Sequence, residues 1–145
     1  MFGIFLIFLC RIKPMEIPEK ADIYKTPLSV QWFDEEGIFC SVTNKNIEIT
    51  REELVTVFTY IKSQSGGKKI CWLGDISMAN SADKETREFA AEITPSLVEA
   101  LALVTDSPVS RMLGNLFIGL QKPAYPVKLF TNETEARKWL RNYIS

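Results

Sequence analysis

Residues 69–82 read KICWLGDISMANSA, an apolar run that passes through Gly74 and Asp75 into a short polar loop. A helical pattern begins after this loop, at about Asp83. In chains that alternate strands and helices, such a junction lies at the carboxyl end of a strand, where these folds usually bind ligands or are modified. The stretch therefore predicts a strand over 69–73, a functional edge of the sheet, and a helix beyond it.

The segment before this strand predicts a hairpin and a helix. Residues 28–33 and 38–43 both suit strands, and residues 34–37 (DEEG) form a turn between them. Residues 50–53 (TREE) are a capping box, in which a threonine caps a helix and a glutamate reaches back to it. Gly66 and its glycine neighbour are expected to end that helix.

The second half repeats the strand and helix alternation. A helix is expected over 83–93, and the apolar run 100–105 is interpreted as a buried parallel strand rather than as helix. A third helix, capped by Ser107, carries an apolar stripe of Val109, Met112, Leu113, Leu116, Phe117 and Leu120. A last strand over 127–130 precedes a final helix. The order ββαβαβαβα predicts an α/β fold in which helices pack on a mixed, mostly parallel sheet.

Composition narrows the functional classes. The chain has 145 residues, 17 Lys and Arg, 18 Asp and Glu, and a net charge of −1, which disfavours nucleic acid as a partner. It has no histidine, which excludes Ser-His-Asp and Cys-His catalysis and most zinc sites. The cysteines (Cys10, Cys40 and Cys71) are widely spaced, as expected for free thiols in a reducing cytoplasm. We expect one domain over residues 15–145, a cytoplasmic location, and no metal or cofactor.

The N-terminal extension, residues 1–14, is treated apart from the fold. Residues 2–9 are almost wholly apolar, but they are too few to cross a bilayer, which takes about 20 residues in a helix. Three interpretations remain open. Met15 is the true initiator and the extension is a start-site artefact, or the extension is an extra strand or a hydrophobic arm that covers a partner, or it is a weak membrane anchor. A hydrophobic arm would favour a homodimer.

Chemistry is expected where the strand-end loops 74–82, 106–108 and 121–126 meet. The first two loops lead into helix N-termini, whose free N–H groups favour anions. The candidate residues for binding a partner or ligand are Asp75, Asn80, Ser107, Arg111 and Asn115. The serines also have a simpler role as caps, and the helix residues as solvated side chains. Asp75 has no second carboxylate near it in sequence, so we assign no catalytic residue.

The order of elements, together with residues 74–77 and Ser81, resembles STAS domains, the fold of bacterial anti-sigma-factor antagonists. Those domains carry an Asp-Leu-Ser-like strand end and a serine at the start of the next helix, which a partner kinase phosphorylates. The resemblance implies Ser81 as a phosphosite and Ser77 as a second candidate. The Asp-Ser-Ser/Thr-Gly signature is absent, and residues 80–82 (NSA) stand near its place.

The C-terminal half resembles the SpoIIAA-like branch, also described as STAS/SEC14-like. The matching residues are 102–104 (ALV), 107–108 (SP), Arg111, 115–117 (NLF), 122–123 (KP), 130–133 (FTNE), 135–136 (EA) and 139–140 (WL). The likeness covers about residues 28–143. It implies a non-enzymatic regulatory module with a protein partner of the anti-sigma or kinase kind. The alternative that it implies is a carrier of a lipid or small apolar ligand. For this alternative we expect an apolar pocket between the third helix and the sheet, lined by Phe117, Trp72 and Trp139.

Overall fold

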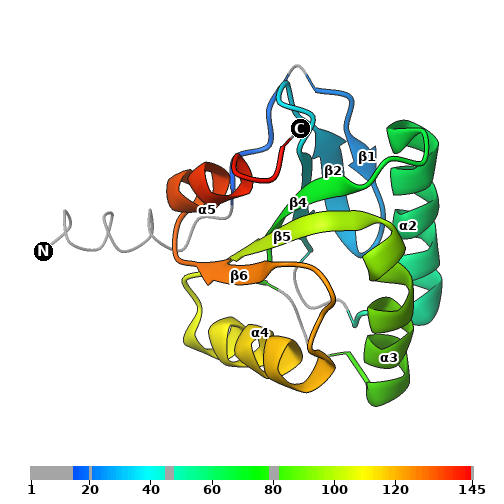
Figure 1. The fold of residues 1–145 in the computed structure, drawn as a ribbon, viewed down its shortest axis with the longest axis vertical. Coiled ribbons are helices and arrows are strands. Elements are labelled where there is room, and N and C mark those ends of the chain that lie inside the picture. The colour runs from blue at the N-terminus through cyan, green and yellow to red at the C-terminus, as the bar shows by residue number, and fades with distance from the viewer. Residues whose placement is uncertain (1–14, 20, 45–47, 79–81, 145) are drawn as a thin grey trace, which may run out of the picture.

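One mixed sheet organises the chain (Figure 1). The computed structural model describes residues 15–19, 21–44, 48–78 and 82–144. The strands are β1 (Tyr24–Lys25), β2 (Ser29–Phe33), β3 (Phe39–Thr43), β4 (Ile70–Asp75), β5 (Val98–Val104) and β6 (Val127–Phe130). The helices are α2 (Arg51–Ser65), α3 (Lys84–Ile93), the short 3-10 helix η1 (Thr94–Ser96), α4 (Pro108–Gln121) and α5 (Glu133–Leu140).

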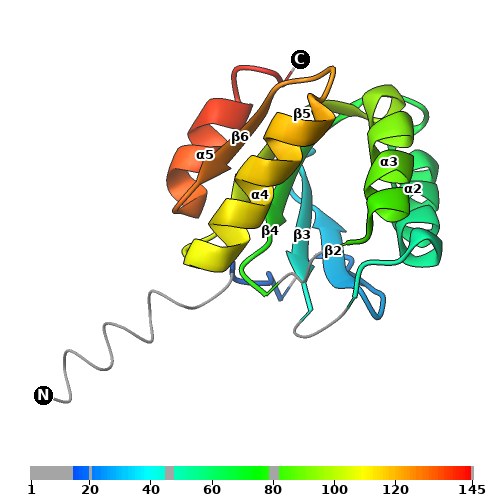
Figure 2. The same ribbon diagram turned by 90° about the horizontal axis from the view of Figure 1, so that it is seen from below.

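The strands lie in the sheet in chain order, from β1 to β6. β2 and β3 form the predicted antiparallel hairpin, whose turn uses Gly37 at φ 80°, and β3 to β6 are parallel. Right-handed crossovers between successive neighbours place α2, α3 and α4 on one face, and α2 and α3 lie side by side (Figure 2). The predicted mixed α/β architecture is confirmed. β1 was not predicted, because two residues carry no periodic signal.

Alternating side chains divide the core into two layers. Cys40 and Leu73 point toward α5 and pack with its Leu140, and all three are fully buried. Phe39 and Leu101 point toward the opposite face, where Ile61 of α2 covers them. Burying each such side chain contributes about 1.5–3 kcal/mol. The sheet is therefore covered on both faces.

Side-chain caps begin four helices at the residues that the sequence favours. In each case the cap oxygen accepts a hydrogen bond from the backbone N–H three residues later. The capping residues are Thr50, Asp83, Ser107 and Asn132. Gly66 ends α2 in the left-handed region, as predicted. These local signals explain why the helix starts agree with the sequence.

The prediction that one apolar stripe of α4 faces the core is wrong for the first turns of the helix. Val109 and Met112 have 62% and 63% of their side chains exposed. The face of the first turns that meets the protein carries Ser110, which is 3% exposed. Further along, Gly114 lets the helix approach β6, since a Cβ there would lie 3.0 Å from a methyl group of Leu129. The side chains of Leu113, Leu116, Phe117 and Leu120 lie outside the described part of the structure.

The expectation that Trp72 and Trp139 line one pocket with Phe117, between the third helix and the sheet, is also wrong. Trp72 lies on the α2 face, where it meets Phe39 edge-on with a centroid distance of 5.1 Å. Trp139 lies on the α5 face, packed against Phe130 at 5.6 Å. The sheet separates the two indoles, so they cannot line one cavity.

Candidate functional site

The carboxyl end of β4 carries Asp75, whose side chain is 3% exposed and lies on the α5 face. Its Oδ1 accepts a 2.9 Å hydrogen bond from the backbone N–H of Ser77. Its Oδ2 accepts a 2.8 Å bond from the backbone N–H of Met15. This carboxylate, predicted to bind a partner or ligand, therefore holds two segments of backbone.

The loop after β4 is tied directly to α4. The Ser110 hydroxyl donates a 3.2 Å hydrogen bond to the carbonyl of Ser77, and Ser107 caps the same helix. The backbone N–H of Ser107 donates in turn to the Thr105 hydroxyl at 3.0 Å. The structure thus brings Asp75, Ser77 and Ser107 into one connected edge, as expected for the first two loops. The expectation that loop 121–126 joins them is wrong, because this loop leads into β6 at the opposite end of the sheet, where the Tyr125 hydroxyl donates to Thr94 before β5. Asn80 and Ser81 lie outside the described residues.

Next to this edge, the first turns of α4 present a mixed apolar and polar surface. We call Val109, Arg111, Met112 and Asn115 the α4 outer surface, and all four side chains are exposed. Among the described residues, Arg111 has no ion-pair partner. The predicted candidates Arg111 and Asn115 therefore face outward beside two exposed apolar side chains.

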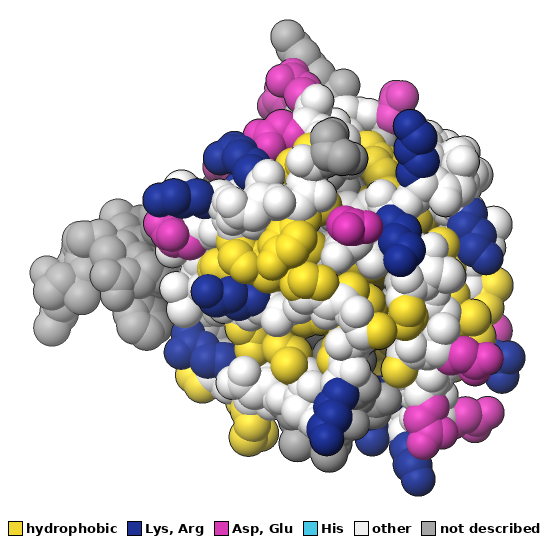
Figure 3. Space-filling model, viewed as in Figure 1, with side chains coloured by type: hydrophobic (Ala, Val, Ile, Leu, Met, Phe, Trp, Pro, Cys, Tyr) yellow, Lys and Arg dark blue, Asp and Glu magenta, His cyan; other side chains and the backbone are white. Residues whose placement is uncertain are grey.

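A second apolar region lies along the edge strand β6. On the face seen in Figure 3, hydrophobic side chains gather around β6, between α5 and α4. Val127, Leu129 and Phe130 of this strand are all only partly buried. No described strand pairs with the outer side of β6. Exposed apolar surface beside a free strand edge is typical of contact regions.

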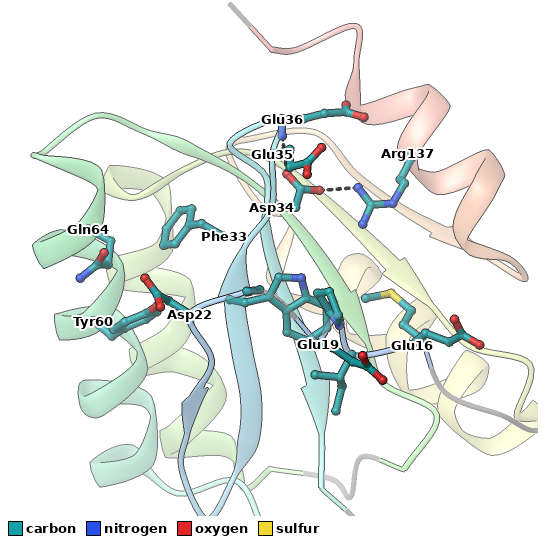
Figure 4. A pocket seen from close by; sticks show the side chains of 15 residues that line it. Glu16, Glu19, Asp22, Phe33, Asp34, Glu35, Glu36, Tyr60, Gln64 and Arg137 are labelled. Carbon is teal, nitrogen blue, oxygen red and sulfur yellow. Dashed lines mark hydrogen bonds and ion pairs between the residues drawn. The ribbon is translucent and has the colours of Figure 1, made fainter.

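A separate hollow of about 1250 Å³ lies between the segment before β1, the β2–β3 turn, α2 and α5 (Figure 4). Its acidic lining residues are Glu16, Glu19, Asp22, Asp34, Glu35 and Glu36, whereas Arg137 is its one basic lining residue in the described part of the chain. Trp32, Phe33 and Tyr60 add aromatic surface. The charge of this hollow suits a cationic group better than an anionic one.

Ion pairs organise one wall of the hollow. Arg137 of α5 pairs with Asp34, and its Nε donates to Glu133 at 2.9 Å. Arg141 pairs with Glu36 at 2.8 Å. Beneath them, burial raises the pKa of the Cys40 thiol to about 12, and the neighbouring Asp34 charge adds to the effect. The Cys40 thiol is therefore protonated at neutral pH.

Sequence reasoning missed this hollow. Residues 34–36 signal only a turn, and the three-residue spacing of Glu16, Glu19 and Asp22 was the available hint of an acidic surface. Among the described residues, no group of three or more Cys, Asp or Glu side chains is arranged to hold a metal ion. None of the described helices is both long and apolar enough to cross a membrane.

Comparisons with known proteins place the fold. A solved structure from Shewanella loihica PV-4, an uncharacterised DUF3478-family protein with a SpoIIAA-like fold, has a TM-score of 0.55 at 12% identity, covering 87% of this chain and 98% of that one. A protein of unknown function from an Arthrobacter species (strain fb24) has 24% identity, with 86% and 96% coverage, but a TM-score of only 0.28. No curated protein matches.

The first of these structures supports the SpoIIAA-like fold and, at this identity, nothing beyond the fold. A family described as "Domain of unknown function (DUF7793)" matches residues 31–144, which is most of the chain. The match begins within β2 and includes every later strand and helix. The chain therefore belongs to the DUF7793 family and has a SpoIIAA-like fold.

Proposed function

We propose that this protein is a non-enzymatic regulatory module that binds a partner protein through the α4 outer surface. The observation that carries the proposal is the exposure of Val109 and Met112, at 62% and 63%, on adjacent turns of one helix. Large apolar side chains grouped in this way favour a surface that is covered in a complex.

The composition of the surface fits a protein partner. Apolar side chains form its centre, while Arg111 and Asn115 supply a polar rim that can form hydrogen bonds. Methionine adapts its shape to a partner, and arginine is enriched in protein interfaces. The partly buried apolar residues of β6 form a second apolar region.

A phosphorylation switch at Ser81 is part of the proposal and rests on the resemblance to STAS domains. A phosphoserine adds about −1.5 to −2 charges at pH 7. At Ser77 this charge would lie two residues from the buried Asp75 carboxylate and would be repelled by it. Ser81 is therefore the better candidate. The hydrogen bond from Ser110 to Ser77 offers a route from the loop after β4 to α4.

One observation favours the alternative of a small-ligand carrier. Gln31 is 0% exposed, and its Oε1 has no hydrogen-bond partner among the described residues. A polar group of a ligand would satisfy it. Native mass spectrometry of the protein purified from its own cells tests this alternative. The alternative predicts that a bound molecule of constant mass is retained.

Photo-crosslinking in the native cell tests partner binding. A photoreactive amino acid replaces Arg111 in one variant and Ser63, an exposed residue of α2, in the control. The proposal predicts one discrete protein adduct at position 111 and none of the same mass at position 63. Equal adduct patterns at both positions would contradict it.

A folding control accompanies the crosslinking. Replacing both Val109 and Met112 by serine, with the photoreactive group retained at position 111, should remove the adduct. Replacing Val55, which is 46% exposed on α2, by serine should leave the adduct intact. Both variants should unfold close to the temperature of the parent protein, because the replaced side chains are all exposed on the surface.

A further inference from the structure

Asp75 is a buried carboxylate whose described hydrogen-bond partners are neutral. It is 3% exposed, and it accepts from the backbone N–H groups of Met15 and Ser77. The described ion pairs of the chain all involve other carboxylates. Burying an ionised carboxylate is costly unless a positive charge accompanies it. In the described part of the chain, the hydrogen-bond partners of this carboxylate are therefore peptide N–H groups, and no ion pair involves it.

The backbone nitrogen of Met15 donates one of the two described hydrogen bonds to Asp75. The Met15 backbone N donates a 2.8 Å hydrogen bond to Asp75 Oδ2, so a charged group at this nitrogen would be in direct contact with the carboxylate. Its side chain is 7% exposed and packs in the core layer that contains Trp32 and Leu73. Chain termini are usually poorly ordered unless something ties them down, and here both the backbone and the side chain of Met15 are fixed.

The sequence independently singles out the same residue. Residues 2–9 are apolar, Arg11 and Lys13 follow, and Pro14 stands directly before Met15. This composition differs from the folded part of the chain, and Met15 is a residue at which translation can start.

We propose that Asp75 is a binding site for the free α-ammonium group of Met15, in a form of the protein whose first residue is Met15. Initiation at Met15 leaves this nitrogen as a free α-ammonium. Hydrolysis of the Pro14–Met15 peptide bond gives the same group: water supplies an oxygen to the carbonyl carbon of Pro14, which becomes a carboxylate, and the protons of the water pass to the released nitrogen of Met15. The neutral hydrogen bond then becomes a buried ion pair. Because the other oxygen of Asp75 holds Ser77, the new N-terminus also anchors the loop after β4.

The charge environment of this nitrogen determines its titration. The titratable groups near Met15 are Asp75 on β4, the adjacent Glu16, Cys40 and Cys71 in the shared core layer, and Asp34 and Arg137 across the hollow. An ordinary α-amino group has a pKa of about 7.7–8.0. A carboxylate in direct contact favours the charged form of an ammonium, so the pKa of the Met15 amine should lie above this ordinary range.

The experiment compares the 15–145 chain with the same chain carrying Asp75→Asn. The α-amine pKa is measured from the pH dependence of its acetylation rate, with the modified site identified by mass spectrometry. At pH 7.5 the parent amine should react at least about tenfold more slowly than that of Asp75→Asn. A third chain, with one glycine added before Met15, moves the ammonium away from Asp75 and should react at the ordinary rate.

Two results would overturn the proposal. One is an α-amine pKa in the ordinary range that Asp75→Asn leaves unchanged. The other is an intact mass of the natively purified protein in which no species begins at Met15. The glycine-extended chain retains Asp75 and an amide at Met15, so a failure to fold in Asp75→Asn alone still leaves the comparison between the two remaining chains decisive.

Discussion

The backbone N–H of Met15 lies 2.8 Å from Oδ2 of Asp75, a residue 60 positions further along the chain. This contact fastens the segment before β1 to the end of a central strand. The second carboxylate oxygen fastens Ser77, whose carbonyl accepts from Ser110 of α4. One buried acid thus joins the N-terminal segment, the loop after β4 and the helix that we propose as the docking element.

Asp75→Ala should lower the free energy of unfolding of the 1–145 chain by about 3–6 kcal/mol. The change removes two hydrogen bonds to a charged acceptor and leaves their donors buried, and each such bond contributes about 1.5–3 kcal/mol. Urea denaturation measures the loss. Asp75→Asn keeps one acceptor oxygen and should lose less. A loss below about 0.5 kcal/mol for Asp75→Ala, the range of ordinary surface changes, would show that these bonds contribute little.

Above pH 9, the free energy of unfolding should depend on the ionisation of the buried Cys40 thiol. Its pKa is about 12 in the folded protein against an ordinary value of 9.0. The folded state therefore binds more protons than the unfolded state in this interval, and this contribution to stability, complete below pH 9, is lost as the pH rises toward 12.

The measurement is urea denaturation of the parent protein and Cys40→Ala between pH 8 and pH 11. The stability difference between them should shrink by about 1.4 kcal/mol per pH unit above pH 9. Cys40→Ala also leaves a cavity, but the cost of that cavity does not depend on pH. A difference that stays constant across the range would contradict the raised pKa.

Leu140→Ala should lower the free energy of unfolding by about 2–5 kcal/mol, the usual cost of removing a buried leucine side chain. Leu140 is 0% exposed and fixes α5 on the sheet. Ile144→Ala is the matched control, because this side chain is 36% exposed four residues away. Thermal unfolding of the two variants should differ clearly, and equal melting temperatures would mean that α5 does not pack as described.

Ser107→Ala should cost about 1 kcal/mol, since the Ser107 hydroxyl caps α4 through the N–H of Ser110. Ser107→Asp should retain most of the stability, because a carboxylate accepts the same hydrogen bond. Chemical denaturation distinguishes the two variants. Equal losses in both would indicate that Ser107 acts through something other than its cap.

Local signals made much of the fold predictable, and long-range contacts made the rest unpredictable. Thr50 and Ser107 were identified as caps because a cap acts within three residues of its partner. Asp34 and Arg137 are 103 residues apart, so no local sequence pattern predicts their ion pair. Val109 and Met112 share the helical spacing expected of core residues, and periodicity alone cannot tell which face of α4 meets the sheet.

The sequence predicted which residues meet at the candidate edge, but it did not predict the contacts that they make there. Parallel strands end together, so Asp75, Ser77 and Ser107 were expected to meet. The burial of Asp75 depends on Met15, which sequence spacing does not connect to it. The exposure of the α4 outer surface follows from the orientation of the helix, in which Ser110 faces inward.

The affinity of the crosslinked partner, once purified, tests the central claim most directly. Isothermal titration calorimetry compares the parent protein with the Val109→Ser, Met112→Ser double variant and with Val55→Ser. The account predicts a dissociation constant at least tenfold larger for the double variant and a change within twofold for Val55→Ser. Equal affinities for all three proteins would contradict docking through the α4 outer surface.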